Sequence, residues 1–530
     1  MRKMIFFSVL VLSIISMSIS CKEEQTEKVT HSQKLPDPYQ EKHRPQFHFT
    51  PEAKWMNDPN GMFFYKGKYH LFYQYYPDST VWGPMHWGHA ESKDLVHWKH
   101  LPIALYPDSL GLIFSGGAVV DLNNTSKFGT KENPPIVATF THHNLEGEKA
   151  ETNDFQTQSI AYSLDEGVKW TKYGHNPVIP NTEGIKDFRD PKVVWHEKSQ
   201  QWILVLAAYD KVKFYASPNL IDWTHLSDFG IDGDIRLWEC PDLFPIKVEG
   251  SDEEKWALIV SIQKNAPNGG TASSYFIGHF DGKTFTSDVK KQKWLDWGAD
   301  NYAFVTWNNI PKDDGRIIGI GWMSNWQYAQ IVPTENWRSA MTLPRELKLT
   351  RSNTDYHLIS SPVKELQALR KDSTLISPFQ VEDRHVLEAS FSPSQFEIVM
   401  EIDLKETTAG SFGFELKNDL GENLVITFDK GGDMLYVDRT NSAKTKFSED
   451  FFGKKHYAPL NYDEDTMNIQ LFVDASSLEI FVNGGKLSFT DIFFPSEKFN
   501  TVSLFSQKGA WKIKDTKIYS LNSIWKPRKK

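Results

Sequence analysis

Short apolar and aromatic runs, separated by clusters of Gly, Pro, Asn and Asp, fill the chain from about residue 46 to residue 347, with hardly any helical period. Such spacing predicts strands joined by turns. Three segments of this region share a Ser, a polar turn and a Trp, and a fourth is a weaker relative: Ser92–Trp98, Ser163–Trp170, Ser217–Trp223 and Phe280–Phe285. Repeating units of roughly 50 to 70 residues, each with several strands and a turn, are typical of β-propeller blades.

The repeat predicts an all-β chain with an N-terminal propeller. Unit starts fall near five positions, which gives five blades: Asn57, Ser115, Asp190, Glu239 and Asp300. A short helix is expected at Pro362–Arg370, and from about residue 377 alternating runs such as Leu424–Phe428 predict a C-terminal β-sandwich. The predicted boundaries are a leader at 1–21, a tether at 22–46, the propeller at 47–347, a connector at 348–376 and the sandwich at 377–526.

The first residues have the pattern of an export signal. Arg2 and Lys3 precede an apolar run that ends near residue 19 and is too short for a comfortable membrane span. Ser20 and Cys21 then resemble the cleavage box of bacterial lipoproteins, although Ser18 stands where that box usually has Leu. We expect lipid attachment at Cys21 and export to the bacterial outer membrane, on its periplasmic face or the cell surface. Ordinary signal cleavage is the alternative.

Composition narrows the range of partners. The net charge of −9 argues against nucleic acid, because phosphate binding needs clustered Lys and Arg. The chain has 18 Trp, 19 Tyr and 35 Phe, and flat aromatic faces suit the C–H faces of sugar rings. Of its two cysteines, Cys240 has no partner if Cys21 carries lipid, so no disulfide is expected. Membrane contact is expected only through the lipid.

Three carboxylates stand in similar turn-forming surroundings. Asp58 lies in the run Trp55–Gly61, Asp190 directly precedes a Pro, and Glu239 precedes a Cys-Pro pair. An isolated Asp of this kind usually caps its own turn. Each of these three acids, however, opens a proposed blade, and the first strand of a blade lines the central axis, so the three side chains are expected to meet. Glycoside cleavage needs such a set, with one carboxylate near the anomeric carbon and one protonated acid at the leaving oxygen.

The residues around these acids resemble the signature blocks of glycoside hydrolase family 32, the β-fructofuranosidases. The matching blocks are Trp55–Gly61, Phe114–Gly117, Phe188–Pro191 and Trp238–Pro241. Further matching segments follow the family's order: His48–Pro51, Trp82–Ala90, Gly321–Trp326 and Asn336–Ser339. The resemblance covers nearly all of residues 45–347, with Gly117 as a departure where many members have Ser. The C-terminal part resembles the family in architecture more than in motif.

The resemblance implies a retaining mechanism and a fructose pocket. It implies that Asp58 is the nucleophile, Glu239 the acid and base, and Asp190 the residue that stabilises the transition state. The positions that match the pocket are Asn57, Gln74, Trp82, Phe114, Ser115, Arg189 and Trp322, with Asp300 and Tyr302 as candidates for its rim. No cofactor and no metal are implied.

Other polar residues near these blocks are assigned structural roles. Asp187 and Asp242 are expected to be solvated loop charges, and Cys240 is expected to be a small packing residue. His86 and His89 lie close together, but no Cys or carboxylate completes a ligand set around them. We therefore expect both to be ordinary propeller histidines.

The expected function is that of an exported exo-fructanase. It would act as a monomer, release fructose from the non-reducing ends of levan or inulin, and also split sucrose. Four alternatives stay open: an endo-acting levanase, an inverting hydrolase of the related five-bladed arabinan and xylan families, a non-catalytic fructan-binding protein on the same scaffold, and a fructosyl transferase. The preference for β-2,6 or β-2,1 linkages is open as well.

Overall fold

Strands make up nearly all the regular structure of the chain. The computed structural model describes residues 39–288, 291–353, 355–388 and 391–525. Within these ranges it contains 36 strands, two 3₁₀ helices, and two α-helices of five and four residues. The predicted all-β class is therefore confirmed. No helix in the described ranges has the length and apolar character to cross a bilayer. Cys21 and most of the predicted tether lie outside them.

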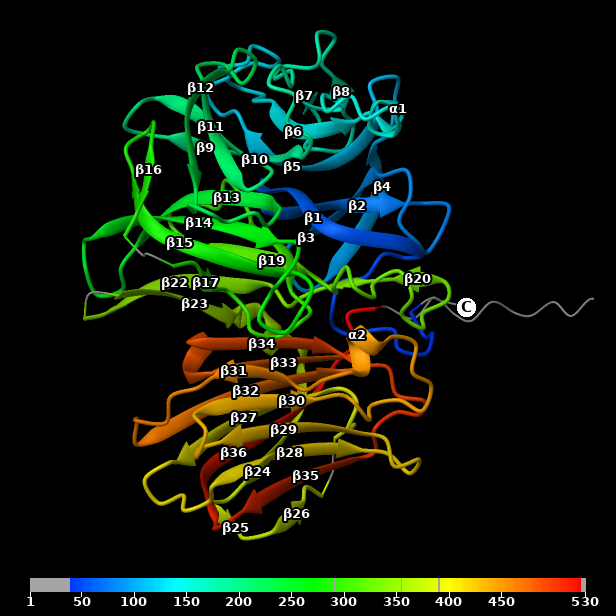
Figure 1. Cartoon of the computed structure of the whole chain (residues 1–530), viewed down its shortest axis with the longest axis vertical. Helices are drawn as coiled ribbons and strands as arrows, with labels where there is room; N and C mark the ends of the chain where they lie inside the picture. The colour runs from blue at the N-terminus through cyan, green and yellow to red at the C-terminus, as the bar shows by residue number, and fades with distance from the viewer. Residues whose placement is uncertain (1–38, 289–290, 354, 389–390, 526–530) are drawn as a thin grey trace, which may run out of the picture. The chain divides into compact units, whose positions relative to one another are not determined.

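Five sheets follow one another along the first two thirds of the chain (Figure 1). The first contains β1 (Lys54–Tyr65), β2 (Lys68–Tyr76), β3 (His86–Ser92), β4 (Trp98–Leu105) and the short β20 (Trp337–Arg338). The second contains β5 (Leu112–Val120), β6 (Ile136–His143), β7 (Gln156–Ser163) and β8 (Thr171–Lys172), with α1 (Leu145–Lys149) between β6 and β7. The third contains β9 (Phe188–His196), β10 (Gln201–Ala208), β11 (Lys211–Ser217) and β12 (Thr224–Gly230).

The last two of these sheets keep the same order with small additions. The fourth contains β13 (Trp238–Lys247), β14 (Glu254–Ile262), β15 (Ala272–Phe280), β16 (Phe285–Ser287) and β17 (Lys293–Trp294). The fifth contains β18 (Tyr302–Thr306), β19 (Ile317–Met323), β21 (Ala340–Met341), β22 (Arg345–Ser352) and β23 (Asp355–Pro362). In every sheet the first long strand pairs antiparallel with the next one along the chain.

The first strands of the five sheets form a closed ring. β1 contacts β5, β5 contacts β9, β9 contacts β13, β13 contacts β18, and β18 contacts β1. The parallel pairing of β20 with β1 adds a link between the last part of this region and its start. A closed ring of sheets around their innermost strands is a β-propeller, and the five predicted blades are confirmed.

The Ser and Trp of the sequence repeat mark the same turn in the first three blades. Each Ser ends the third strand of its blade, and each Trp lies at the start of the fourth. In Trp98, Trp170 and Trp223 alike, the indole nitrogen donates a hydrogen bond of 2.9–3.1 Å to the carbonyl of the residue three positions earlier. A large apolar ring thereby covers the turn while its one polar atom is satisfied.

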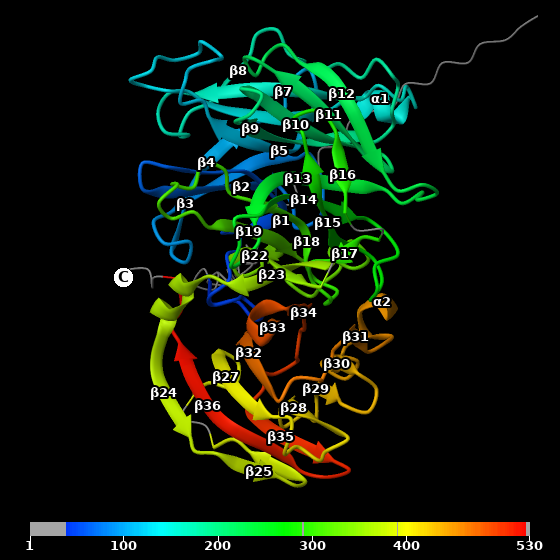
Figure 2. The ribbon, with the colours of Figure 1, turned by 90° about the vertical axis from the view of Figure 1, so that its left-hand side faces the viewer.

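The C-terminal part is a sandwich of two antiparallel sheets, as predicted. One sheet contains β24 (Arg370–Ile376), β25 (Phe379–Val381), β27 (Phe396–Asp403), β32 (Thr466–Asp474), β33 (Ser477–Val482), β34 (Leu487–Ile492) and β36 (Trp511–Leu521). The other contains β26 (Arg384–Val386), β28 (Ser411–Lys417), β29 (Asn423–Asp429), β30 (Met434–Asp438), β31 (His456–Pro459) and β35 (Thr501–Gln507). Figure 2 shows the two sheets as stacked layers.

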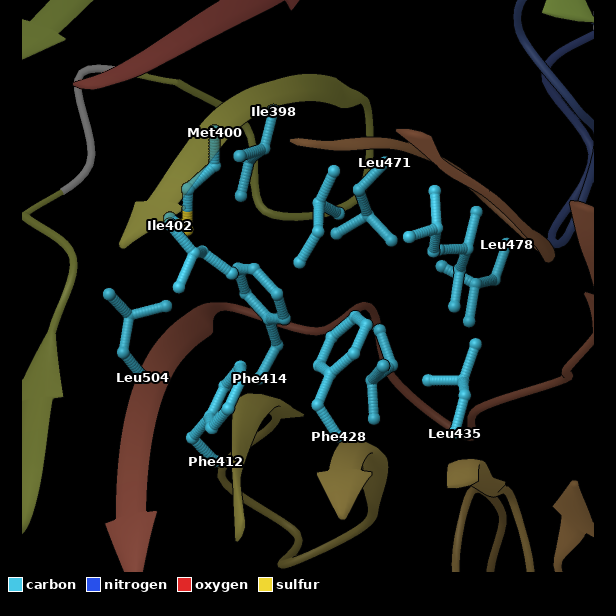
Figure 3. Close-up of a cluster of buried hydrophobic side chains, with 14 of the residues drawn as sticks. Ile398, Met400, Ile402, Phe412, Phe414, Phe428, Leu435, Leu471, Leu478 and Leu504 are labelled. Atoms are coloured by element: carbon cyan, nitrogen blue, oxygen red, sulfur yellow. The ribbon is translucent and has the colours of Figure 1, made fainter. Parts of the chain in front are cut away.

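Alternating residues of both sheets fill the space between them. Along β29, Leu424, Ile426 and Phe428 are buried while their neighbours are partly exposed. These side chains pack in one cluster with residues of the facing sheet. Figure 3 shows Phe428 of this cluster together with Ile398 and Leu471 of the facing sheet. Burying an aliphatic or Phe side chain stabilises a fold by about 1.5–3 kcal/mol, so this cluster is the main source of stability of the sandwich.

The predicted connector at 348–376 is too long. Arg345–Ser352 and Asp355–Pro362 form a hairpin of the fifth blade, and Arg370–Ile376 is already a strand of the sandwich. The link that remains is a 3₁₀ helix at Lys364–Leu369, at the place of the predicted short helix. Sequence alternation identifies strands but does not say which sheet a strand joins, so this boundary could not be read from the sequence.

Buried charges join the propeller to the sandwich. Arg345 of β22 contacts Asp296 at 2.7 Å and Glu479 of β33 at 2.6 Å. His48 lies between Asp474 and Glu479, at 2.8 Å and 3.0 Å. Burial opposes the charge on His48, but hydrogen bonds to the two carboxylates outweigh it and raise its pKa to about 9. The described part of the chain forms one compact unit.

Candidate active site

The inner strand of every blade carries a β-bulge near its N-terminal end. Two residues of the inner strand there face a single residue of the second strand: Asn57–Asp58, Phe114–Ser115, Asp190–Pro191, Cys240–Pro241 and Ala303–Phe304. A bulge breaks the alternation of a strand and turns its side chains in a new direction. Because the inner strands contact one another in a ring, the bulges bring residues from distant parts of the sequence into one cleft.

Three of these bulges hold the backbone in an unusual conformation, and Ala303, with φ +54°, is in the bulge of the fifth blade. Asp190 has φ +65° and Cys240 has φ +45°, both in the left-handed region that side chains other than Gly rarely adopt. Asp190 and Cys240 are each followed by a Pro, which has no amide to donate to the sheet and is tolerated at a bulge. The strain is retained where the side chains are held by specific contacts.

The carboxylates of Asp58 and Asp190 meet at Cys240. The thiol sulfur of Cys240 lies 3.6 Å from Oδ2 of Asp58 and 3.6 Å from Oδ2 of Asp190. The backbone amide of Cys240 donates a further hydrogen bond of 3.0 Å to Asp190. Burial, together with the nearby carboxylates, raises the thiol pKa well above its usual range, so Cys240 stays protonated as a donor.

Neighbouring polar groups fix the orientation of Asp58. Ser115 donates a hydrogen bond of 2.8 Å to Oδ2, and the side-chain amide of Asn57 donates one of 3.0 Å to Oδ1. Asn57 is itself held, because its oxygen accepts a hydrogen bond of 2.7 Å from the indole nitrogen of Trp55. Gln74, opposite the bulge on β2, donates to the carbonyl of Ile113 at 3.1 Å.

Glu239 is held from two sides by groups of other blades. Arg189 of β9 donates to Oε1 at 2.8 Å and 3.2 Å, and Tyr302 of β18 donates to Oε2. Arg189 also pairs with Asp187, through its other terminal nitrogen. The carboxylate therefore has one fixed position beside the bulge at Cys240.

Burial makes the negative charge on two of the three acids less favourable. Burial, and then the charge of Glu239, raises the pKa of Asp58. Burial also raises the pKa of Asp190; the charge of Arg189 opposes this rise and those of Glu239 and Asp58 add to it, and the result is about 7. Closely spaced carboxylates that bind a proton between them are the arrangement used for acid and base chemistry.

The acids lie in a cavity of about 440 Å³ with a polar floor and aromatic walls. Residues of the predicted set that line it are Asn57, Asp58, Gln74, Trp82, Phe114, Ser115, Arg189, Asp190 and Glu239. Residues that the sequence did not point to are His143, Glu148, Gln156, Lys186, Asp187, Leu237, Gln263, Trp326 and Gln330. A cavity of this size, with several convergent polar groups, suits a sugar unit and part of a second one.

Comparison with known proteins assigns the family. "Glycosyl hydrolases family 32 N-terminal domain" matches residues 48–362, and "Glycosyl hydrolases family 32 C terminal" matches residues 365–520. The chain belongs to glycoside hydrolase family 32. This family 32 chain is 46% identical to a levanase of Bacillus subtilis over 92% of its own length and 72% of the relative's. It is 36% identical to an extracellular exo-inulinase of Aspergillus niger, over 92% of its own length and 96% of the relative's.

A solved structure agrees with this assignment. The family 32 chain superimposes on the exo-inulinase of Aspergillus awamori with a TM-score of 0.83 and 33% sequence identity, covering 92% of this chain and all of that one. The propeller and sandwich architecture therefore belongs to the family, and the chain is a glycoside hydrolase.

Three residues predicted to form the fructose pocket of this family 32 chain do not line the cleft, and one of them, Tyr302, is buried with its hydroxyl group on Glu239. Trp322 is completely buried and packs behind Trp55 and Trp326, and it is Trp326 that lines the cleft. Asp300 is also completely buried, because its carboxylate pairs with Arg439 at 2.6 Å. Trp326 ends the same Gly321–Trp326 block, so the structure brings this block to the cleft through Trp326 instead of Trp322.

Two acids predicted to be solvated have defined partners instead. Asp187 lines the cleft and pairs with Arg189. Asp242 is completely buried, lies 3.3 Å from Nζ of Lys192 and accepts a 2.6 Å hydrogen bond from the amide of Thr306. The reasons differ. Asp187 is held by Arg189, two residues along the chain. Asp242 is buried, a buried carboxylate needs a cation or several donors, and its partners come from other blades that are remote in sequence.

The histidines of the Trp82–Ala90 block bind neighbouring protein groups. His86 lies 2.9 Å from the carbonyl oxygen of Pro84, and His89 is buried 3.1 Å from His70. Among the described residues, no group of three or more His, Cys, Asp or Glu side chains is arranged to hold a metal ion.

Proposed function

We propose that this family 32 enzyme releases fructose from the non-reducing ends of β-fructans, levan or inulin, and also hydrolyses sucrose. Its levanase and exo-inulinase relatives match over 92% of the chain. The cleft offers aromatic walls at Trp82, Phe114 and Trp326, which suit the apolar faces of a sugar ring. Its polar floor offers many donors and acceptors for hydroxyl groups.

The proposal rests chiefly on the convergence of Asp58 and Asp190 at the thiol of Cys240, directly beside Glu239. We assign Asp58 as the nucleophile because Ser115 and Asn57 fix its carboxylate in one orientation. We assign Glu239 as the acid and base because its carboxyl group faces the same cleft from the adjacent blade. These three positions are also the ones that match the family's motifs.

In the proposed reaction, Asp58 attacks the anomeric C2 of the terminal fructosyl unit while Glu239 gives its proton to the leaving oxygen. The bond between C2 and that oxygen breaks, and a bond between C2 and a carboxylate oxygen of Asp58 forms. Water then adds to C2, Glu239 takes its proton, and the bond to Asp58 breaks. Asp190 stabilises the positive charge that develops on the ring in both steps, and binds sugar hydroxyls together with Arg189.

Digestion of levan, inulin and sucrose tests the substrate class and the mode of attack. The products of each digest are separated by thin-layer chromatography over a time course. We expect fructose as the only product from the polymers, and fructose together with glucose from sucrose. A ladder of oligosaccharides at early times would show endo action, new longer oligosaccharides from sucrose would show fructosyl transfer, and no product from any substrate would leave only a binding role.

We further propose that the enzyme is exported, carries lipid on Cys21 and acts as a monomer. Extracellular relatives support export, and the Ser-Cys sequence after the apolar run supports the lipid. Labelling with palmitate in the native host should mark the wild type and not Cys21→Ser, and light scattering of the soluble enzyme should give the mass of one chain.

A further inference from the structure

One wall of the cleft is a loop between β19 and β20 that reaches the substrate site with two side chains. Trp326 and Gln330 both line the cleft. The Trp326 ring packs against Trp322 at 4.8 Å and Trp55 at 5.8 Å between ring centroids. Gln330 accepts a 3.3 Å hydrogen bond from the amide of Trp82, the aromatic residue next to it in the cleft lining.

Tyr328 lies between these two residues and is buried instead of facing the cleft. Its amide donates to the carbonyl of Asn325 at 3.1 Å, and its own carbonyl accepts from the amide of Ile331 at 3.0 Å. These two backbone hydrogen bonds make a tight turn around Tyr328. A shift of Tyr328 would therefore also move Trp326 and Gln330, which lie on either side of it.

The hydroxyl of Tyr328 is held by a buried ion pair that includes a residue of the sandwich. It donates to Asp300 at 2.6 Å and accepts from Arg439 at 2.8 Å. Arg439, directly after β30, contacts Asp300 at 2.6 Å and is completely buried. It also donates to the carbonyls of Phe451 and Ile492, at 3.0 Å and 2.9 Å. All the nitrogens of this guanidinium are thus engaged, so its position is fixed.

We propose that Arg439 is a positioning residue for substrate binding, by which the sandwich sets the shape of the cleft wall. Tyr328 is the connecting residue, and Asp300 keeps the charge of Arg439 paired. An Arg with a rigid set of donors fixes its partners in direction as well as distance, which a Lys does not. The catalytic acids lie on other strands and do not contact Arg439, so this residue affects binding of the substrate more than the bond-breaking steps.

The test compares Tyr328→Phe, which removes only the connecting hydroxyl, with Arg439→Lys, which keeps the charge. The matched control is Glu479→Gln, which breaks another buried ion pair between propeller and sandwich, with Arg345, and has no contact with the loop. Thermal unfolding, kcat and KM are measured for all of them on sucrose and a short inulin, well below the lowest Tm.

Because one to two hydrogen bonds are lost, KM should rise about 3- to 10-fold in Tyr328→Phe and Arg439→Lys while kcat changes less than about two-fold. In Glu479→Gln, Tm should fall while KM stays at the wild-type value. If both Tyr328→Phe and Arg439→Lys have a lower Tm but an unchanged KM, the inference is overturned, since that is the result of a purely structural contact. The inference rests on the proposed function, which is tested separately by whether the wild-type enzyme hydrolyses sucrose and the short inulin. If wild type hydrolyses neither substrate, the function itself fails.

Discussion

The backbone amide of Cys240 donates a 3.0 Å hydrogen bond to Oδ2 of Asp190, so a residue of the fourth blade fixes a carboxylate of the third. Both residues have positive φ, and such backbone strain costs of order 1–3 kcal/mol per residue. The thiol of the same Cys reaches Asp58 as well. Cys240 therefore joins two acids of the cleft, which is more than the packing role expected from its size.

Removal of the thiol should shift the pH dependence of the reaction. Burial and the charge of Glu239 raise the pKa of Asp58, and hydrogen bonds from Ser115, Asn57 and Cys240 oppose this rise. Cys240→Ala removes one of these bonds, so the pKa of Asp58 should rise further and the acidic limb of the kcat/KM profile should move to higher pH. Cys240→Ser retains a donor and should move that limb less. Identical acidic limbs in wild type and Cys240→Ala would contradict a role for the thiol.

Asp190→Asn should stabilise the fold at high pH while abolishing activity. The pKa of Asp190 is about 7 in the fold, above the value of 3.8 for a free Asp, so between these values the folded protein binds a proton that the unfolded chain has released. The stability from this proton is fully present below pH 3.8 and is lost as the pH rises through 7. The Tm of Asp190→Asn should therefore exceed that of wild type at pH 8 and approach it near pH 4. A lower Tm than wild type at pH 8 would contradict this account.

His48 should make the contact between propeller and sandwich dependent on pH. Its pKa is raised from 6.5 to about 9, so its stabilising contribution is complete below pH 6.5 and is lost as the pH rises through 9. His48→Gln should lower the stability at pH 6.5 by about 3–5 kcal/mol, the usual cost of breaking a buried ion pair. The difference from wild type should shrink by pH 9.5. His86→Gln, which leaves this cluster intact, should show no such pH dependence, and a constant deficit in His48→Gln would refute the assignment.

Glu239→Ala should lower kcat on sucrose by about 10²- to 10⁴-fold, the range typical of general acid–base catalysis. The loss in kcat/KM, which reports the first step alone, should be smaller for a fructoside with a nitrophenol leaving group, because a good leaving group needs little help from a proton. The values of kcat/KM for both substrates in wild type and variant give this comparison, with Tm as the check on folding. An equal loss for both substrates would argue that Glu239 is a binding residue instead of the acid.

Much of the fold followed from local chemistry. The alternating strands, the repeated turn ending in Trp98, Trp170 or Trp223, and the block around Asp58 are all properties of short segments, and these gave the propeller, the sandwich and most of the cleft. The β-bulges could not be predicted from the sequence. A bulge depends on the register between two paired strands, and the sequence of one strand alone does not show it.

The errors concern residues whose environment comes from remote parts of the chain. The resemblance to the family predicts Asp300 at the pocket rim, but Arg439, far along in the sandwich, pairs with its carboxylate in the interior. The sequence around Asp242 predicts a solvated charge, because nothing in it points to the partner Lys192, which lies in the preceding blade. Trp322 and Trp326 share one motif, and only the packing against Trp55 decides which ring faces the cleft.

The stereochemistry of the product decides whether Asp58 acts as a nucleophile in a two-step reaction. Proton and carbon NMR spectra recorded in the first minutes of sucrose or inulin hydrolysis, before mutarotation, identify the anomer of fructose that is released first. If Asp58 is the nucleophile, β-fructofuranose is released first, with the configuration of the substrate retained. Release of the α anomer first would mean that water attacks C2 directly, and would contradict the assignment of Asp58.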